Sequence, residues 1–433
     1  QAICGRIGMP GGAVLPGHMM PIGSHSDERS TKTWRTVATN SFPVCGCFPP
    51  NVMPEEIMSD HPERLRAVMV SGANPLRSYA DTTAYEEAFR RLDLLVTAEI
   101  AMTETAVLSH YVLPSRSAYE SWDGTFFPMT FPGIYFQMRR PIVEAEGEPL
   151  ELGEIHLRLA DELGLIPPIP ESLYRAAEEG RAAFAEALLA YAAAEPAAMK
   201  SMPFIIGKTL GKVMGSVHLA ALWGMLQTAP SSFRENAVRA GFAPGPNLAE
   251  EVFQKIVNHP EGIWVGRVDP ERNLSHLQTE DGKINLFIPE LLAELQAVDA
   301  EREEAALVPD PRFPLILMAG KHASINANTL MRNPAWNAGR RDCTIAMHPA
   351  DAQALHLTDG QMVRVTTEAG AEEIEVELTD AAYRGHVVIP HGFGLVYDGV
   401  KYKANVNRLT KNTHRDWFGT PIHRYVPCRV EAV

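Results

Sequence analysis

The sequence reads VMVSGANPLRSYADT from Val68 to Thr82 and LDLLVTAEIAMTETAVLSHYVLPSRSAYE from Leu92 to Glu120. Each segment opens with a short apolar run that is typical of a buried strand, and the residues between them favour a helix. The order strand, turn, helix, strand indicates an open α/β sheet, in which ligands bind at the carboxyl ends of the strands. We therefore expect a ligand site at Gly72 to Pro75 and at Met102 to Thr105.

The residue types at these two strand ends suit a nucleotide. Gly72 would let backbone N–H groups approach a pyrophosphate, and the amino end of the following helix would favour the anion. The side chains of Asn74 and Glu104 are able to hydrogen-bond a sugar or the edge of a guanine. A tight turn would also account for Gly-x-Asn-Pro, and its combination with Thr103-Glu104-Thr105 is what favours a ligand site.

The composition is that of an acidic globular chain. With 433 residues the chain is long enough for roughly two or three cores, and 45% of its residues are hydrophobic and 21% charged. The formal net charge of -14 argues against nucleic acid or an anionic membrane as a partner. Lys, His and Gly interrupt the least charged stretch, Met199 to Pro230. No membrane-spanning helix is therefore expected, and an amphipathic helix that packs on a partner is expected there instead.

The five cysteines are too scattered for a local metal site. No CxxC pair occurs, which argues against a zinc ribbon and against a complete local set of iron–sulfur ligands. Cys45-Gly46-Cys47 would suit a metal or redox pair, although two loop cysteines before a Pro-Pro turn are the simpler interpretation. An odd number of dispersed thiols suits a reducing compartment. The cysteines are Cys4, Cys45, Cys47, Cys343 and Cys428.

Three regions follow one another along the chain. Residues 1–165 contain a segment rich in Gly, Pro and His, the strand-helix-strand unit and a helix from Leu152 to Leu163. Residues 166–310 are rich in Ala, Glu and Leu and predict a mostly helical continuation or insert. Residues 311–433 change to short β-branched runs separated by Gly turns, which suits a compact β-barrel.

The hydrophobic pattern places the elements of the last two regions. Helices are expected at residues 172–194, 204–226, 248–257 and 289–306. Short strands are expected at residues 264–269 and 284–288. The barrel strands are expected at residues 315–318, 344–347, 362–367, 373–378 and 386–390.

Several phrases of the sequence resemble the catalytic subunits of the molybdopterin oxidoreductases, the dimethyl-sulfoxide-reductase-like family. The family commonly reads T-E-T-A followed by A-D-V-V-L-P, and Ser109-His110-Tyr111 replaces its Ala-Asp-Val here. The resemblance implies an α/β fold, in which a portion of a Rossmann-like dinucleotide-binding domain and a helical segment precede a carboxyl-terminal six-stranded β-barrel of the double-psi type. The phrases are Asn74-Pro75, Thr103-Glu104-Thr105-Ala106, Tyr111-Val112-Leu113-Pro114, His348-Pro349-Ala350-Asp351-Ala352 and Asn405-Val406-Asn407-Arg408-Leu409-Thr410.

The resemblance also implies a cofactor, bis(molybdopterin guanine dinucleotide) with molybdenum or tungsten. In this family a loop like residues 320–329 wraps the pterin and pyrophosphate, and a solvated loop is the alternative. Lys321 would pair with phosphate, and His322 would lie near the metal pocket. Asn405 and Asn407 are both candidates because the register of the phrase is not fixed.

Glu120 and His391 would lie near the same cofactor, although a surface carboxylate and a simple turn would also account for them. No catalytic residue and no metal ligand is assigned within the chain. The expected cofactor-binding residues are Gly72, Asn74, Pro75, Thr103, Glu104, Thr105, Glu120, Lys321, His322, Asn326, Asn328, Thr329, His391, Asn405 and Asn407.

The phrase from Gln1 to Gly12 resembles one that lies well inside the family's catalytic subunit, after its iron–sulfur segment and its metal-ligating residue. The resemblance therefore implies a match to the carboxyl-terminal portion of such a subunit. An iron–sulfur cluster would come only from a missing segment or from a partner polypeptide that carries the amino-terminal half. An electron-transfer subunit is also expected. A cytoplasmic location is expected, with the periplasm as the alternative.

Two functions remain open on the sequence. The main hypothesis is the cofactor-binding carboxyl-terminal part of a molybdenum or tungsten oxidoreductase that performs two-electron redox chemistry. The alternative is a non-catalytic scaffold or assembly subunit that retains the fold without metal, in which the loops at residues 321–329 and 405–410 would be solvated. The sequence does not distinguish a formate-dehydrogenase-like reaction from oxygen-atom transfer.

Overall fold

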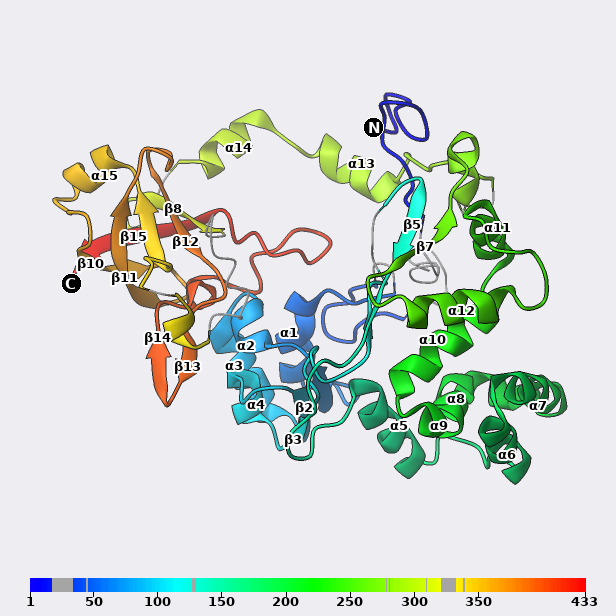
Figure 1. The fold of residues 1–433 in the computed structure, drawn as a ribbon. Coiled ribbons are helices and arrows are strands. Elements are labelled where there is room, and N and C mark those ends of the chain that lie inside the picture. Colours follow the sequence, from blue (N-terminus) through cyan, green and yellow to red (C-terminus); the bar gives the residue numbers. More distant parts are fainter. Residues whose placement is uncertain are drawn as a thin grey trace. The chain divides into compact units, whose positions relative to one another are not determined.

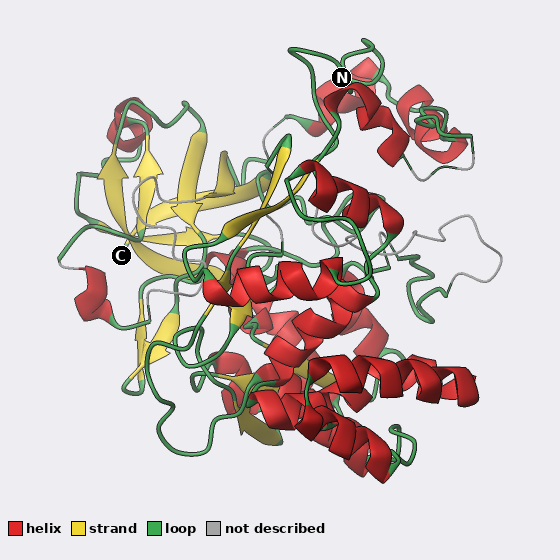
Figure 2. Cartoon of the chain, turned by 45° about the vertical axis from the view of Figure 1, so that its right-hand side comes forward, coloured by secondary structure: helices red, strands yellow, loops and turns green. Residues whose placement is uncertain are grey.

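The computed structural model describes residues 1–17, 34–43, 46–126, 130–277, 279, 281–308, 310–320, 332–337 and 339–433. The chain divides into two compact units, and each is formed by segments far apart in the sequence. We define unit 1 as Gln1–Ile22 with Pro114–Ala297, and unit 2 as Gly23–Leu113 with Val298–Val433. Most helices lie in unit 1 and most strands in unit 2, as Figures 1 and 2 show.

The first half of unit 2 is the expected strand, turn, helix, strand arrangement. Its sheet has the order β1-β2-β3, and β1 pairs in parallel with β2 from Ala67 opposite Leu94 onward. The carboxylate of Asp81 caps α3 by accepting the N–H of Ala84 at 3.0 Å. The elements are the 3-10 helix η1 (Pro50–Val52), α1 (Met53–Met58), β1 (Ala67–Ser71), α2 (Pro75–Ser78), α3 (Thr82–Arg91), β2 (Leu94–Glu99), α4 (Glu104–Leu108) and β3 (Tyr111–Pro114).

The second half of unit 2 contains a closed barrel of six strands in the order β10-β11-β9-β12-β8-β15, which confirms the expected fold class. Side chains alternate along its strands, so that Val363 and Val365 of β10 are buried while Met362 and Arg364 are exposed. The strands are β8 (Leu315–Gly320), β9 (Thr344–Met347), β10 (Met362–Thr366), β11 (Ala371–Leu378), β12 (His386–Pro390) and β15 (Val426–Ala432).

Smaller elements surround the barrel. A two-stranded hairpin, β13 (Leu395–Tyr397) with β14 (Val400–Tyr402), precedes the 3-10 helix η5 (Val406–Leu409). The others are α14 (Ala300–Ala306), the 3-10 helix η4 (Pro334–Asn337) and α15 (Pro349–Ala354).

Unit 1 is mainly helical, and one apolar core, with the indole of Trp223 among its most buried groups, joins its helices from α6 to α12. Its strands are β4 (Asp123–Gly124), β5 (Gly133–Phe136), β6 (Met138–Arg139) and β7 (Ile263–Arg267). Its helices are α5 (Leu152–Glu162), α6 (Glu171–Glu179), α7 (Arg181–Ala194), η2 (Pro196–Ser201), α8 (Met202–Lys208), α9 (Leu210–Met214), α10 (Val217–Gln227), α11 (Ser231–Arg239), α12 (Leu248–Asn258), η3 (Pro270–His276) and α13 (Pro289–Gln296).

Three expected helices prove to be interrupted. The helix at residues 172–194 is two helices, because the backbone of Gly180 has φ +129° and cannot continue an α-helix. The helix at residues 204–226 is three, with breaks at Thr209 and at Gly215, which ends α9 in the left-handed conformation. The helix at residues 289–306 is two, because the side chain of Asp299 caps a new helix at the N–H of Arg302.

Two further expectations are wrong. No strand forms at residues 284–288, where the side chains of Leu286 and Phe287 are exposed and no strand of the described residues pairs with the segment. The helix α10 is not amphipathic and packs in the core of unit 1 rather than facing a partner, with Leu219, Leu222 and Trp223 buried.

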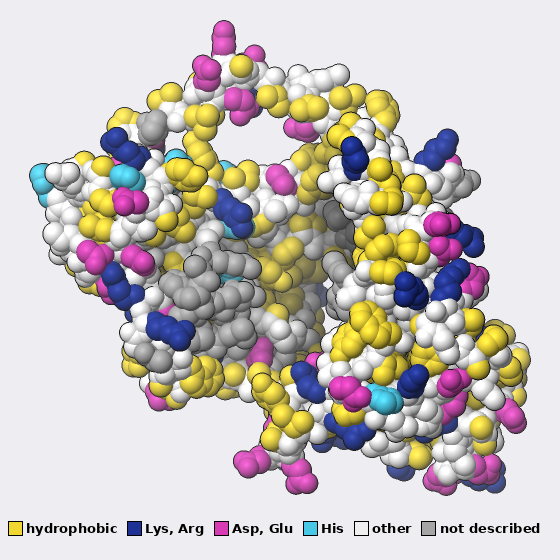
Figure 3. Space-filling model, turned by 45° about the horizontal axis from the view of Figure 1, so that its top comes forward, with side chains coloured by type: hydrophobic (Ala, Val, Ile, Leu, Met, Phe, Trp, Pro, Cys, Tyr) yellow, Lys and Arg dark blue, Asp and Glu magenta, His cyan; other side chains and the backbone are white. Residues whose placement is uncertain are grey.

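Surface charge follows the acidic composition. On the face drawn in Figure 3, Lys and Arg side chains are interspersed with Asp and Glu, which is not the arrangement of a polyanion-binding surface. Within the described part of the chain, no helix is long and apolar enough to cross a membrane.

Candidate cofactor-binding site

The two predicted strand ends meet in unit 2. After β1, Gly72 adopts φ +56°, and Pro75 occupies the first turn of α2. After β2, Thr103 caps α4, and its hydroxyl accepts the N–H of Ala106 at 3.1 Å. The hydroxyl of Thr105 donates to Asn74 Oδ1 at 2.8 Å, so the Gly-x-Asn-Pro turn and the Thr-Glu-Thr phrase are joined directly.

Glu104 is the centre of this site. Its Oε2 accepts from the amide of Asn74 at 2.7 Å, and its Oε1 accepts the N–H of Val396 in β13 at 2.7 Å. The guanidinium of Arg332 forms a two-pronged ion pair with both oxygens, at 2.9 and 3.1 Å. Both side chains are largely buried, with 16% of Arg332 and 7% of Glu104 exposed.

These contacts decide the charge of the carboxyl group. Burial alone would raise the pKa of Glu104, but the hydrogen bonds from Arg332, Val396 and Asn74 outweigh it and lower the pKa to about 2. Glu104 is therefore an ionised carboxylate whose oxygens are occupied by protein donors. Its physical role is to fasten the carboxyl end of β2 to the barrel half of unit 2.

The two predicted asparagines of the barrel half make contacts of the same kind. The amide of Asn405 donates to the hydroxyl of Thr82 at 2.9 Å, and its Oδ1 caps η5 at the N–H of Asn407. The amide of Asn407 donates to the carbonyl of Arg77 at 2.8 Å, and Arg77 Nε donates to the carbonyl of Gly394 at 2.8 Å. Both asparagines are buried and tie the barrel half to α2 and α3.

A cavity of about 280 Å³ lies beside the β13 strand that binds Glu104. Two of its lining residues, Asn337 and Asp342, each have a buried Oδ1 that accepts no hydrogen bond from any described residue. Asp342 Oδ1 lies 3.3 Å from the ammonium of Lys403, an ion pair without hydrogen-bond alignment. The lining residues are Pro334, Asn337, Gly339, Arg340, Asp342, Phe393, Leu395, Tyr402 and Lys403.

Such unpaired buried oxygens are costly unless a donor reaches them. Pterin and guanine rings carry N–H donors on a flat edge, and the rings of Phe393 and Tyr402 supply an apolar wall. The acceptor oxygens of Asn337 and Asp342 therefore suit the N–H edge of a bicyclic heteroaromatic group. The ammonium of Lys403 and the guanidinium of Arg340 disfavour a cation in this cavity.

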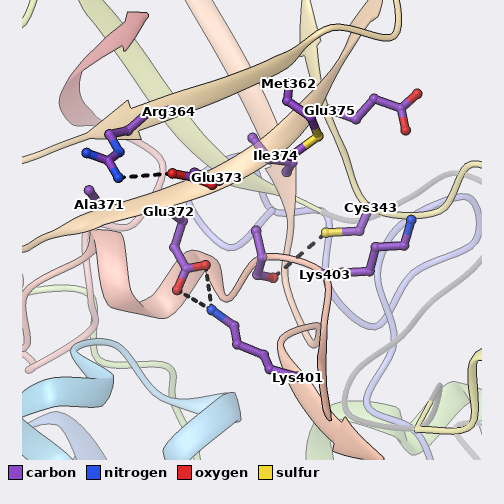
Figure 4. Close-up of a pocket in the computed structure, with 11 residues that line it drawn as sticks. Cys343, Met362, Arg364, Ala371, Glu372, Glu373, Ile374, Glu375, Lys401 and Lys403 are labelled. Atoms are coloured by element: carbon purple, nitrogen blue, oxygen red, sulfur yellow. Dashed lines mark hydrogen bonds and ion pairs between the residues drawn. The ribbon is translucent and has the colours of Figure 1, made fainter. Parts of the chain in front are cut away.

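A larger cavity of about 550 Å³ lies on the barrel, and Figure 4 shows its lining. Two ion pairs lie within its lining, since Lys401 binds Glu372 at 2.6 Å and Arg364 binds Glu373 at 2.9 Å. Two more of its charged side chains, Glu375 and Lys403, pair with Arg341 and Asp342 outside the lining. The thiol of Cys343 is buried, and burial raises its pKa to about 12. Its thiol is therefore protonated at neutral pH in this environment.

The remaining predicted residues divide into two groups. Glu120 lies in unit 1, where its carboxylate accepts the N–H of Ser117 at 2.7 Å and closes a local turn, a contact that also lowers its pKa. His391 follows β12, and its N–H donates to the carbonyl of Gly320 at 2.9 Å, at the edge of the barrel where β8 ends. Lys321, His322, Asn326, Asn328 and Thr329 lie outside the described residues.

Sequence reasoning missed three groups of this site. Arg332, the N–H of Val396 and the pair of Asn337 with Asp342 carried no motif of their own. Arg332 lies three residues after the polar loop at residues 320–329, and this basic residue was the available signal. Within the described ranges no group of three His, Cys, Asp or Glu side chains is arranged to hold a metal ion.

Comparison with known proteins places this geometry in a family. The family model for molybdopterin oxidoreductase matches residues 4–161, and the model for the molydopterin dinucleotide binding domain matches residues 315–427. The chain is 30% identical to the F420-dependent formate dehydrogenase 1 subunit alpha of Methanococcus maripaludis, over 91% of this chain and 46% of the relative. It is 23% identical to the trimethylamine-N-oxide reductase of Haemophilus influenzae, over 95% of this chain and 48% of the relative.

The fold agrees with these matches. The acetylene hydratase of Pelobacter acetylenicus superposes with a TM-score of 0.58 at 18% identity, over 89% of this chain and 47% of the hydratase. The chain spans about half the length of the curated relatives it matches. The two family models together take in more than half of the sequence and include both halves of the site. The chain belongs to the molybdopterin oxidoreductase family.

Proposed function

We propose that unit 2 binds a molybdopterin guanine dinucleotide as part of a molybdenum or tungsten oxidoreductase. The observation that carries the proposal is the cavity beside the β13–β14 hairpin, where the buried Oδ1 atoms of Asn337 and Asp342 accept no hydrogen bond from any described residue. The cavity lies in the region that matches the dinucleotide-binding family model. The bound metal would supply two-electron redox chemistry, and the protein would supply binding and orientation.

Some residues of the site would contact the dinucleotide, and others would hold the walls of the site in place. Gly72, His391 and the loop residues Lys321, His322, Asn326, Asn328 and Thr329 would contact the dinucleotide, with phosphate oxygens on the lysine and on backbone N–H groups. Glu104 and Arg332 would hold the walls of the site together, since their polar atoms already bind one another. The same supporting role would fall to Asn74, Thr103, Thr105, Asn405 and Asn407.

We propose further polypeptide as the source of the metal-ligating residue and of any iron–sulfur cluster. The chain spans about half the length of its relatives, and one of them is named as a subunit alpha, which supports both a longer catalytic subunit and an electron-transfer partner. We propose a cytoplasmic location, because an odd number of dispersed thiols suits a reducing compartment. The substrate class is a small molecule that exchanges two electrons, as with formate or an N-oxide.

The cavity can be tested by substitution in the complex purified from the source cell. Asp342→Ala removes one unpaired oxygen at the proposed ring-binding wall, and we expect the content of acid-released guanine nucleotide to fall several-fold. Glu373→Gln on the exposed side of the barrel is the matched control and should keep the wild-type content. Equal nucleotide content in both variants would overturn the assignment of this cavity.

A further inference from the structure

The loop between η5 and β15 contains a tight turn that presents two aromatic side chains to solvent. The turn runs from Asp416 to Gly419, and the carboxylate of Asp416 accepts the N–H of Phe418 at 2.9 Å. Gly419 is buried with φ +80°, and a Cβ on it would lie 2.7 Å from the side chain of Pro49. The backbone of the turn is therefore fixed, yet Trp417 and Phe418 at its tip are 46% and 39% exposed.

A second segment of unit 2, far away in the sequence, extends this group of rings. The ring centroid of Phe42 lies 5.4 Å from that of Trp417, and the ring of Trp417 lies 5.0 Å from that of Phe418. The guanidinium of Arg35 lies over the ring of Phe42 at 5.1 Å. We define the aromatic surface as Arg35, Phe42, Trp417 and Phe418.

Two consecutive glutamates of α1 hold the two segments in place. Glu55 forms a two-pronged ion pair with Arg415, which directly precedes the turn, at 3.0 and 2.9 Å. Glu56 is buried and accepts the N–H groups of Ala38 and Thr39 at 3.0 and 2.8 Å. The fold thus fixes both segments and leaves large aromatic rings at the surface, and such an arrangement is typical of a binding surface.

The charges around the aromatic surface are unbalanced. The carboxylates of Glu55, Glu56 and Asp416 are occupied by the contacts described above. In the described ranges of the chain, Arg35 and the exposed Arg424 of the same loop pair with no carboxylate. The aromatic surface is therefore locally basic on a chain whose net charge is -14, and an acidic partner would complement it.

The geometry of the rings favours a polypeptide as the partner. The ring planes of Phe42 and Trp417 meet at 66° and those of Trp417 and Phe418 at 80°, so these pairs offer no parallel faces that would sandwich a flat ligand. An uneven surface of aromatic rings with an arginine is typical of the centre of a protein interface. A second copy of this chain on a two-fold axis would bring the same unpaired cations together, which is unfavourable.

We infer that the aromatic surface is the docking surface for a partner polypeptide that contributes an acidic segment with apolar side chains. The rings of Trp417 and Phe418 would bury the apolar side chains, and Arg35 would pair with a carboxylate of the segment. The inference goes beyond the proposed function, because none of these residues lines the proposed cofactor cavity.

Photo-crosslinking of the full chain in the source cell tests the inference. The probe is p-benzoylphenylalanine at position 418, introduced as Phe418→p-benzoylphenylalanine, and mass spectrometry identifies the crosslinked peptide. We expect a peptide of another polypeptide with a net negative charge. The matched control is Tyr383→p-benzoylphenylalanine, at an aromatic side chain of unit 2 that is 79% exposed, and it should not crosslink this peptide.

Substitutions in the crosslinking chain separate the charge from the rings. Arg35→Glu should lower the crosslink yield about tenfold, whereas Arg35→Lys keeps the charge and should retain most of the yield. Trp417→Ser should also lower the yield about tenfold, because it removes a ring that would be buried by the partner. The thermal midpoint of the free chain should change by less than about 2 °C in Trp417→Ser, since the indole is half exposed.

The other outcomes overturn the inference. They are the absence of a crosslink at position 418, and a crosslink there to lipid, to a second copy of this chain or to a neutral or basic peptide. An unchanged yield in Arg35→Glu would exclude the acidic partner. If Trp417→Ser lowers the thermal midpoint and keeps the yield, the rings support the fold and bind no partner. A chain that crosslinks as expected but lacks molybdenum, tungsten and guanine nucleotide would refute the proposed function and leave the docking surface standing.

Discussion

Glu104 connects residues that lie far apart in the sequence, and its charge is what holds them. Glu104→Gln keeps the shape but leaves the guanidinium of Arg332 largely buried opposite a neutral amide. We expect the free energy of unfolding, measured by urea denaturation, to fall by about 3 kcal/mol. Glu373→Gln breaks a comparable 2.9 Å pair with Arg364 on the exposed surface and should cost less than about 1 kcal/mol. Equal losses would show that Glu104 is an ordinary surface group.

The lowered pKa of Glu104 gives this contribution a defined pH dependence. The folded-state pKa of about 2 lies below the ordinary value of 4.5, so the stabilisation is fully present above about pH 4.5 and is lost as pH falls toward 2. The amount lost is on the order of 3 kcal/mol. The difference in unfolding free energy between wild type and Glu104→Gln should therefore shrink across this range. A difference that stays constant with pH would contradict the assignment.

Asp342 should behave in the opposite way to Glu104. Its Oδ1 is buried without a hydrogen bond, and its ion-pair partner Lys403 is 42% exposed and can be hydrated. We expect Asp342→Ala to leave the thermal midpoint of the cofactor-free chain unchanged or slightly raised, because an unpaired buried oxygen is removed. A clear fall in that midpoint would mean that Asp342 supports the fold rather than a ligand.

The residues of the site that lie in local sequence patterns were predictable, and those brought in from far away in the sequence were not. Asn74 and the Thr-Glu-Thr phrase were found because strand ends and turn residues are local patterns. Arg332 was not, because it meets Glu104 across 228 residues and a guanidinium in a loop shows no periodicity. The register of Asn405 and Asn407 was left open, and the structure uses both, one on Thr82 and one on Arg77.

The interruptions within the expected helices were harder to predict than the helices themselves. Gly180→Ala tests the break between α6 and α7. A Cβ at Gly180 meets no atom within 4 Å, but a φ of +129° is strained for Ala. We therefore expect the free energy of unfolding of unit 1 to fall by more than about 1 kcal/mol. Gly211→Ala in α9 has ordinary backbone and a nearest neighbour at 3.4 Å, and it should be neutral or stabilising. The thermal midpoint of unfolding is measured for both variants. A fall in the midpoint of both, or a rise in both, would contradict this explanation of the break.

The barrel strands were predicted well and the helical breaks poorly for a physical reason. The short β-branched runs that identify β9 and β12 are a property of four or five consecutive residues. The last strand, β15, contains Pro427, which argues against a strand in the sequence. Its pairing with β8 and β10, both far away in the sequence, makes it one. Breaks such as Thr209 depend on packing within unit 1, which no local pattern encodes.

At the scale of the whole molecule, the family was evident from short phrases while the reaction was not. The phrases mark the walls of the proposed cofactor site, and the family models match the regions that contain them. What determines the reaction is the metal and the residue that ligates it, and the chain spans about half of its relatives. The net charge of -14 and the mixed surface charges agree with a protein partner rather than a nucleic acid.

The central claim is that this chain holds a molybdopterin guanine dinucleotide with a metal. The most direct measurement is the content of molybdenum, tungsten and acid-released guanine nucleotide in the intact complex purified from the source cell. We expect one of the two metals together with guanine nucleotide, in a fixed ratio to the chain. An intact complex that contains neither metal nor guanine nucleotide would contradict it and would favour a scaffold that kept the fold and lost the cofactor.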